Sequence, residues 1–193
     1  MKEMQLGTVA LLVATLTGAC VTEGRWDNAE ALAADSVEVQ IDDSGRPIEV
    51  EYHVAPDAVP AVVHESMDQL HPGGRAVAAE KEYVGSTLYW ELTKEIGGRE
   101  VEAMFHPDGR LHSEEVEVAQ AGVPDVVQKA ALARLDGQIT KLEEIRGSER
   151  QLLEYHAKIT ADGMKYKVRV TADGTVLGVV REVPAEIEVP LRR

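Results

Sequence analysis

The sequence contains a repeat with a spacing of 64 residues, and this repeat restricts the possible folds more than any other feature. The segment Val59–Val63 (VPAVV) recurs as Val123–Val127 (VPDVV). A proline in the first turn of a helix costs nothing, because its missing N–H would have no partner there, so each copy predicts a helix start. Apolar residues follow both starts at helical intervals, which predicts that each helix packs through one face. The chain is therefore expected to contain two copies of one structural unit.

Runs of alternating apolar and polar residues follow each expected helix. They are residues 88–92 and 101–105 in the first copy, and residues 155–159 and 166–170 in the second. Alternation with a period of two predicts strands with one apolar face. Gly-Gly or Asp-Gly dipeptides separate the runs, as is typical of tight turns between antiparallel strands. An antiparallel meander should therefore follow each helix.

A partial third copy precedes the two full copies. Residues 37–45 align with residues 101–109, again 64 positions apart, and they predict a hairpin without a helix. The predicted fold class is α+β, with tandem units of one helix packed on an antiparallel β-meander, preceded by an N-terminal half-unit hairpin. The predicted segments are a signal peptide (1–19), a tether (20–35), the partial-repeat hairpin (36–54), a first unit (55–119), a second unit (120–183) and a tail (184–193).

The first twenty residues are typical of an export signal. Lys2 is followed by an apolar run over residues 6–16, which is too short to span a bilayer, and by small residues before Cys20. The segment ending at Cys20 resembles the bacterial lipobox, although Thr17 replaces the usual leucine, and the resemblance implies lipidation of Cys20. The alternative is ordinary secretion with cleavage after Ala19. We expect an exported protein of the cell envelope, lipid-anchored and facing the periplasm.

The repeated unit resembles the PepSY-like families, including the group described as beta-lactamase-inhibitor-like. The residues that carry the resemblance are the two Val-Pro helix starts, the pairs Trp90-Glu91 and Tyr155-His156, and the Asp-Gly turns at Asp108 and Asp173. The resemblance implies exported proteins in which a helix packs on an antiparallel sheet and the other sheet face is free. Beta-lactamase inhibitor protein, of comparable tandem architecture, grips its enzyme with that free face. No residue of this sequence matches its specific contact residues.

No residue pattern points to catalysis. The single cysteine lies in the export signal, and no serine lies in a nucleophile-elbow pattern. The adjacent carboxylates Glu114-Glu115 and Glu143-Glu144 are expected to be solvated, because neighbouring strand residues point to opposite faces. The six histidines lack metal-ligand spacing such as HExxH, so we expect scattered surface histidines. The sequence therefore predicts a protein that is not an enzyme, with no cofactor and no metal site.

The formal net charge of −14 limits the possible partners. An acidic surface repels nucleic-acid phosphates and anionic lipid head groups, so we expect no nucleic-acid partner and membrane attachment through the lipid anchor only. A partner recognised by charge should be basic. The alternative is that the acidic surface serves solubility alone.

The polar faces of the expected strands form the candidate binding face. It consists of Tyr89, Glu91, Glu100, Glu102 and Met104 in the first unit, and of Glu154, His156, Lys158, Lys165, Lys167 and Arg169 in the second. An acidic part beside a basic part can dock a partner of complementary charge, although strands that merely face water would show the same pattern. The expected function is a non-enzymatic envelope lipoprotein that binds an exported or periplasmic protein or peptide, with hydrolase inhibition as one form. The alternative function is a sensory or structural envelope protein that binds a small ligand or cation in the cleft between the units.

Overall fold

The computed structural model describes residues 25–191, which form one antiparallel sheet of ten strands and three short α-helices. The strands follow one another in the sheet in the order of the sequence. Their bounds are β1 Ser36–Ile41, β2 Pro47–Val54, β3 Arg75–Val84, β4 Thr87–Ile96, β5 Arg99–Phe105, β6 Leu111–Glu117, β7 Gln138–Gly147, β8 Leu152–Ala161, β9 Met164–Val170 and β10 Val176–Arg181. The α-helices are α1 Asn28–Ala33, α2 Ala61–Leu70 and α3 Asp125–Leu132, and single 3-10 turns lie at Pro56–Ala58 and Gln120–Gly122.

The predicted fold class of tandem helix-on-meander units is wrong, because one continuous sheet runs through all the predicted units. β6 pairs with β7 from Ser113 opposite Gly147 to Glu117 opposite Glu143, across the predicted boundary between the two full units. β2 pairs with β3 in the same way, so the N-terminal hairpin belongs to the same sheet. An unpaired edge strand leaves a row of backbone N–H and C=O groups without partners. Pairing of β6 with β7, and of β2 with β3, gives these groups partners. A sequence repeat indicates the elements within each unit, so it does not reveal the pairing of strands between units.

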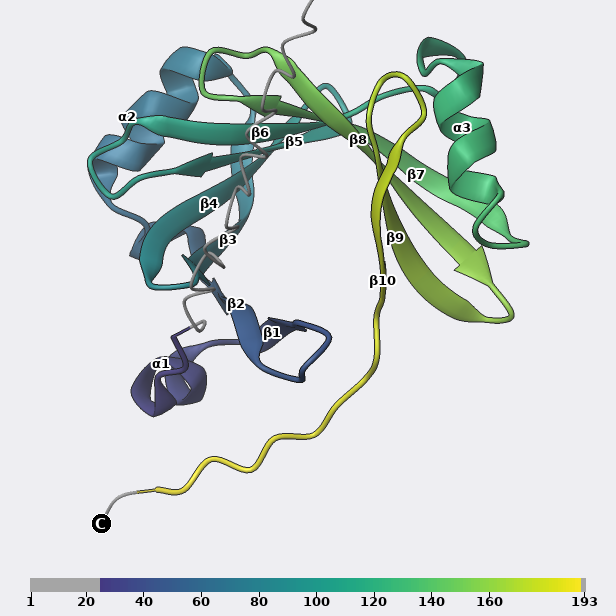
Figure 1. The fold of residues 1–193 in the computed structure, drawn as a ribbon. Helices are drawn as coiled ribbons and strands as arrows, with labels where there is room; N and C mark the ends of the chain where they lie inside the picture. The colour runs from purple at the N-terminus through teal and green to yellow at the C-terminus, as the bar shows by residue number, and fades with distance from the viewer. Residues whose placement is uncertain (1–24, 192–193) are drawn as a thin grey trace, which may run out of the picture.

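The sheet is strongly curved, and α2 and α3 both lie on its convex side (Figure 1). Register shifts within β3 and β7 mark bulges, which bend a strand and increase its twist. α1 packs on the same side of the sheet as α2 and α3, against a small core around Tyr52 and Tyr83. Among residues 25–191, no helix covers the concave side. The two faces of the sheet therefore have different surroundings.

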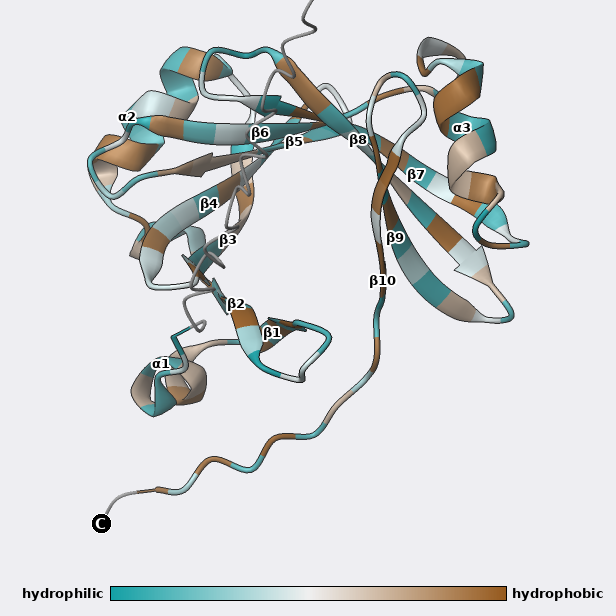
Figure 2. Cartoon of the chain, viewed as in Figure 1, coloured by the Kyte–Doolittle hydropathy of each residue, from teal (hydrophilic) through white to brown (hydrophobic). Residues whose placement is uncertain are grey.

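Three apolar clusters hold the helices to the sheet, and Figure 2 shows the apolar residues alternating along the strands. Val63 and Met67 are the buried residues of α2, and Val127 and Ala131 are those of α3. Each pair is four residues apart, so its members lie on one face of the helix. Beneath the helices lie Leu92, Ala103 and Phe105 in one cluster, and Leu142, Ala157, Ile159 and Val168 in the other.

The N-terminal end of the described chain is bound to the sheet, whereas the C-terminal end continues beyond β10 without regular structure. Residues 28–33, inside the segment predicted as a tether, form α1, whose first turn is capped by the Asp27 carboxylate at 2.8 Å from the Ala29 nitrogen. The Tyr52 hydroxyl accepts a hydrogen bond from the Asp27 N–H at 2.6 Å and so ties this segment to β2. Residues 182–191 contain no helix or strand. None of the helices in the described range is both long and apolar enough to span a bilayer.

Glycines in equivalent turns of the two copies approach the helices closely. A Cβ added at Gly174 would lie 2.6 Å from Val126 Cγ2 on α3, and one at Gly109 would lie 2.7 Å from Ser66 Oγ on α2. We expect Gly174→Ala to lower the free energy of unfolding by about 2 kcal/mol, through steric overlap added to the cost of positive φ. Gly163→Ala, with positive φ but open space around it, should lose only about 1 kcal/mol. Urea unfolding measures both, and equal losses would contradict the close packing of the turn on α3.

Candidate binding face

The residues that point away from the helices form the concave face of the sheet. In an antiparallel pair, residues directly opposite each other point to the same side. Glu102 on β5 is opposite Thr93 on β4 and Glu115 on β6, so all three share one side. The next residue, Ala103, points the other way into the cluster beneath α2. Rows of polar side chains therefore cross the concave face from strand to strand.

The structure places every residue of the predicted binding face on the concave side, by the register of its strand. They lie in two groups, on β4 and β5 and on β8 and β9, with β6 and β7 between them. Three of them are more buried than solvent-facing residues should be: Tyr89, Glu154 and His156 are 8%, 7% and 6% exposed. Their role in binding remains a prediction.

Sequence reasoning missed the concave-face residues of the other strands. They include Glu51 on β2, Glu80 and Glu82 on β3, Glu115 on β6 and Glu143 on β7. The signal was present only in part: Glu80 and Glu82 have the spacing of one strand face, but Lys81 between them is also charged, so the segment shows no alternation of apolar and charged residues. With these residues included, the two predicted groups become parts of one surface.

An acidic zone covers the concave side of β2 to β6, and we define it as Glu51, Glu80, Glu82, Glu91, Glu102 and Glu115. Burial and the charges of Glu49 and Glu80 raise the pKa of Glu82 to about 8. Burial and the charge of Glu115 raise the pKa of Glu102 to about 7. These carboxyl groups are crowded and partly withdrawn from water, so they release their protons near neutral pH rather than near pH 4.5.

The same causes act more strongly elsewhere in the acidic zone. Burial and a hydrogen bond with Glu49 raise the pKa of Glu51 to about 11. Burial, followed by the charge of Glu115, raises the pKa of Glu91 well above its usual range. The zone therefore holds protons that an approaching positive charge would displace.

The concave side of β8 and β9 carries cations paired with buried carboxylates. Arg169 donates two hydrogen bonds to Glu154, at 2.8 Å from Nε and 3.0 Å from Nη2, and His156 Nε2 lies 2.9 Å from the same carboxylate. Although burial opposes ionisation, these contacts lower the pKa of Glu154 to about 2. Burial likewise opposes the charge of Glu143, but Lys141 at 2.7 Å and Lys158 at 3.1 Å lower its pKa.

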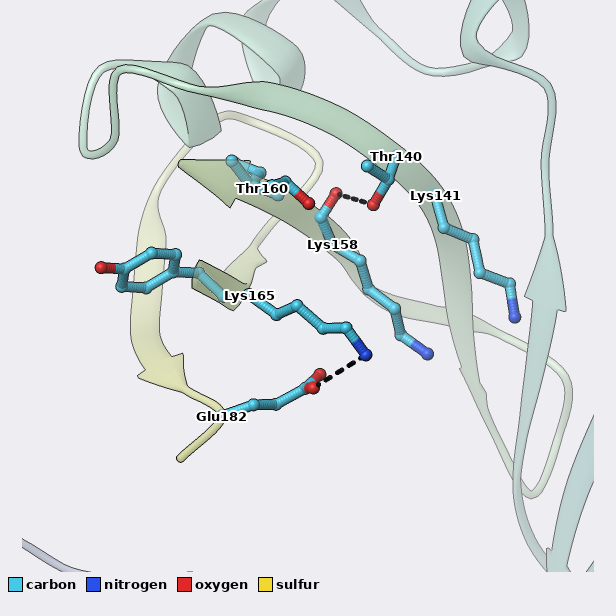
Figure 3. Close-up of a pocket in the computed structure, with 8 residues that line it drawn as sticks. Thr140, Lys141, Lys158, Thr160, Lys165 and Glu182 are labelled. Carbon is cyan, nitrogen blue, oxygen red and sulfur yellow. Dashed lines mark hydrogen bonds and ion pairs between the residues drawn. The ribbon is translucent and has the colours of Figure 1, made fainter. Parts of the chain in front are cut away.

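A basic hollow of about 420 Å³ lies at the end of this region, between β7, β8 and β9. Its walls include Lys141, Lys158 and Lys165, together with Thr140 and Glu182. In Figure 3 the side chains of Lys158 and Lys165 extend into the same space, where Lys165 meets Glu182 at 3.4 Å. Lysine ammonium groups gathered in this way can receive a carboxylate of a partner.

The expectation that the adjacent carboxylates are solvated is wrong for one member of each pair. Glu114 is 0% exposed on the convex side, and Glu143 is 1% exposed on the concave side. Glu114 is held by His71 at 3.0 Å and by Arg150 at 3.1 Å, two residues distant from it in sequence. Burial of these charges depends on partners from other elements, which no sequence pattern displays.

The expectation of scattered surface histidines is also wrong for His156, which is buried. Two groups in the described range bring potential metal ligands within 4.8 Å of one another: Glu38, Glu51 and His53, and Glu115, Glu143 and His156. The second group is drawn from three different strands, so a search for closely spaced ligands in the sequence could not find it; in the first, Glu51 and His53 share β2 and only Glu38 comes from another strand. His53 is 26% exposed at its side chain and pairs with Glu38 and Glu80.

Comparison with known proteins supports the fold and leaves the family open. No protein-family model and no curated protein matches this sequence. A DUF2874 family protein from Bacteroides uniformis matches with a TM-score of 0.50 and 15% identity, over 63% of this chain and 88% of that one. A proposed periplasmic protein from Bacteroides eggerthii matches with a TM-score of 0.51 and 19% identity, over 64% and 88%. A BLIP-like protein from Bacteroides fragilis has a TM-score of 0.47 and 17% identity, over 66% and 89%.

The first two likenesses show that this chain shares the fold of those proteins. At such low identity they carry no function with them. The predicted PepSY-like membership remains a resemblance. Cys20, the predicted lipidation site, lies outside the described residues.

Proposed function

We propose that the chain is a non-enzymatic binding module of the bacterial cell envelope, which holds a protein or peptide against its concave face. The observation that carries this proposal is the placement of α1, α2 and α3 on the opposite side of the sheet, within residues 25–191. An antiparallel sheet with one solvated face ordinarily carries freely ionised side chains there. This face instead keeps carboxyl groups whose pKa values are raised by burial, and such groups gather at functional sites.

The charges of the concave face define the chemistry of the partner. The acidic zone favours lysine or arginine side chains, which would displace its protons and relieve the repulsion among its carboxylates. The basic hollow favours an acidic side chain or a chain terminus. A partner that spans the face would therefore present a basic segment to β2–β6 and an acidic group to β7–β9.

The export signal and the lipobox resemblance support a lipid anchor at Cys20, with membrane contact through the anchor alone. Hydrolase inhibition is the finer form of this proposal, and it rests on the resemblance to beta-lactamase-inhibitor-like proteins. An envelope hydrolase with a basic loop is the partner class to test first.

Charge reversal tests the concave face. We expect Lys165→Glu with Lys167→Glu to reduce partner capture from envelope extracts at least tenfold, because both lysines lie on the concave side of β9. The matched control is Lys129→Glu on α3, whose side chain is 79% exposed on the convex side. Quantitative mass spectrometry of the captured proteins gives the readout. The proposal is contradicted if every partner captured by the unmodified chain is captured equally well by the double variant.

A further inference from the structure

Three potential metal ligands meet where β6, β7 and β8 run side by side on the concave face. Glu115 lies on β6, Glu143 on β7, and His156 is directly opposite Glu143 on β8. One ligand atom from each lies within 4.8 Å of the other two. The register of three neighbouring strands thus holds two carboxylates and an imidazole around one point.

Two buried atoms of this group have no hydrogen-bond partner among the described residues, once Oε1 of Glu143 is assigned to the lysines Lys141 and Lys158 that contact it. His156 is 6% exposed and its Nδ1 is without a partner, as is Oε2 of Glu143, which is 1% exposed. The neighbour of Nδ1 is the Glu115 carboxylate, 3.7 Å away. Buried polar atoms are almost always satisfied, and an ion is one of the groups that can satisfy them.

The other side of the imidazole is fixed in the way a metal ligand requires. His156 Nε2 lies 2.9 Å from Glu154, which Arg169 holds in its ionised form through two hydrogen bonds. An ionised carboxylate can only accept, so Nε2 carries a hydrogen. In the singly protonated ring that binds a metal, Nδ1 then holds the lone pair, on the side of Glu115. A carboxylate that orients the far nitrogen of a histidine is the usual support of a metal-bound imidazole.

We propose that Glu115, Glu143 and His156 bind one divalent transition-metal ion of the zinc type. Zinc accepts nitrogen and carboxylate oxygen together and is satisfied by three protein ligands with one open position, whereas calcium requires six to eight oxygens. Zinc ligands lie about 3.3 Å apart in a tetrahedral site, so ligand atoms that lie within 4.8 Å of one another need to close by at most about 1.5 Å. The metal site does not depend on the proposed docking function. It stands even if the concave face binds no protein or peptide.

The surrounding charges favour a cation despite two nearby lysines. Lys141 and Lys158 both contact Oε1 of Glu143, and Oε2 has no hydrogen-bond partner among the described residues. Glu102 is opposite Glu115 and Glu117 is opposite Glu143, which adds negative charge beside the site. Glu115 also raises the pKa values of several acidic-zone carboxyl groups, and a bound cation would offset this repulsion.

Calorimetric titration of the full chain with ZnCl2 tests the site. All samples carry Cys20→Ser, which removes the only thiol in the sequence. We expect one zinc ion per chain, no saturable calcium binding, and a loss of zinc affinity of at least tenfold in Glu115→Gln and in His156→Gln. Glu154→Gln, which alters the support of the imidazole and the pairing with Arg169 but leaves all three ligands in place, should weaken binding by about 10- to 100-fold.

The matched control is His53→Gln, which removes a histidine from the other ligand group and should leave zinc affinity unchanged. Circular dichroism confirms that each variant is folded, and Glu115→Gln, at a half-buried position, keeps the test valid if His156→Gln unfolds. Replacement of zinc by Co2+ should give the visible absorption of a nitrogen- and oxygen-ligated ion, lost in Glu115→Gln. Absence of saturable zinc binding, or equal binding by Glu115→Gln, overturns the proposal.

Discussion

Glu114→Ala is expected to lower the free energy of unfolding by about 3 kcal/mol, although the residue lies in a strand rich in charges. The carboxylate is 0% exposed and is surrounded by His71 at the end of α2, Arg146 on β7 and Arg150 in the turn after β7. Removal of the carboxylate takes a partner from His71 and Arg146, whose side chains are 14% and 29% exposed, and breaking a buried ionic group in this way is strongly destabilising. The three partners of Glu114 come from both sides of the β6–β7 junction, so the loss also weakens the join between the two halves of the sheet.

Urea unfolding at pH 7 measures this effect, with Glu117→Ala as the control. Glu117 lies on the same strand but is exposed, so its replacement should change stability by no more than about 0.5 kcal/mol. If Glu114→Ala lost less than about 1 kcal/mol, the ionic group would not help to hold the two halves together.

Glu82→Gln is expected to stabilise the chain at pH 8 by about 3 kcal/mol and to leave its stability at pH 4.5 nearly unchanged. The pKa of Glu82 is about 8 in the folded chain, above its ordinary value of 4.5, because of burial and the charges of Glu49 and Glu80. A group with a raised folded pKa contributes its full stability below pH 4.5 and loses it as the pH rises to 8. Glutamine cannot ionise, so the variant escapes this loss.

Thermal unfolding from pH 4.5 to pH 8 measures the pH dependence. The unmodified chain should become less stable over this range, because the pKa values of Glu82 and Glu102 are both raised. The pKa of Glu154 is lowered to about 2 in the folded chain, so its ionised form stabilises the fold. This contribution is lost only as the pH falls below 4.5, outside the measured range. Glu100→Gln, at an exposed position of β5, is the control. A pH profile for Glu82→Gln parallel to that of the unmodified chain would contradict the raised pKa.

The sequence predicted local structure well where local chemistry determines it. The Val-Pro segments precede helices that begin at Ala61 and Asp125, with Pro60 and Pro124 at their N-caps. The alternation over residues 101–105 and 166–170 assigned the apolar side of β5 and β9 correctly. These features depend on the preferences of single residues and on a period of two, both of which are visible in one sequence.

The sequence could not predict how the local elements join. Pairing of Glu115 with Ile145 joins two strands whose paired residues are 30 positions apart and which are connected through α3 rather than by a hairpin turn. The burial of Glu114 beside Arg146, and the approach of Glu115 to Glu143 and His156, follow from that pairing. Sequence reasoning therefore found the concave residues of β4, β5, β8 and β9 but not the acidic zone and ligand group that lie among them.

Site-specific photocrosslinking tests the concave face most directly. A photoreactive amino acid is placed in turn at Glu100 and Thr160, exposed on the concave side, and at Glu65 on α2 and Lys129 on α3, exposed on the convex side. After irradiation in intact cells, we predict that the two concave positions crosslink to the same partner and that the two helix positions do not. Crosslinks to a common partner from α2 and α3, with none from the concave positions, would contradict the account.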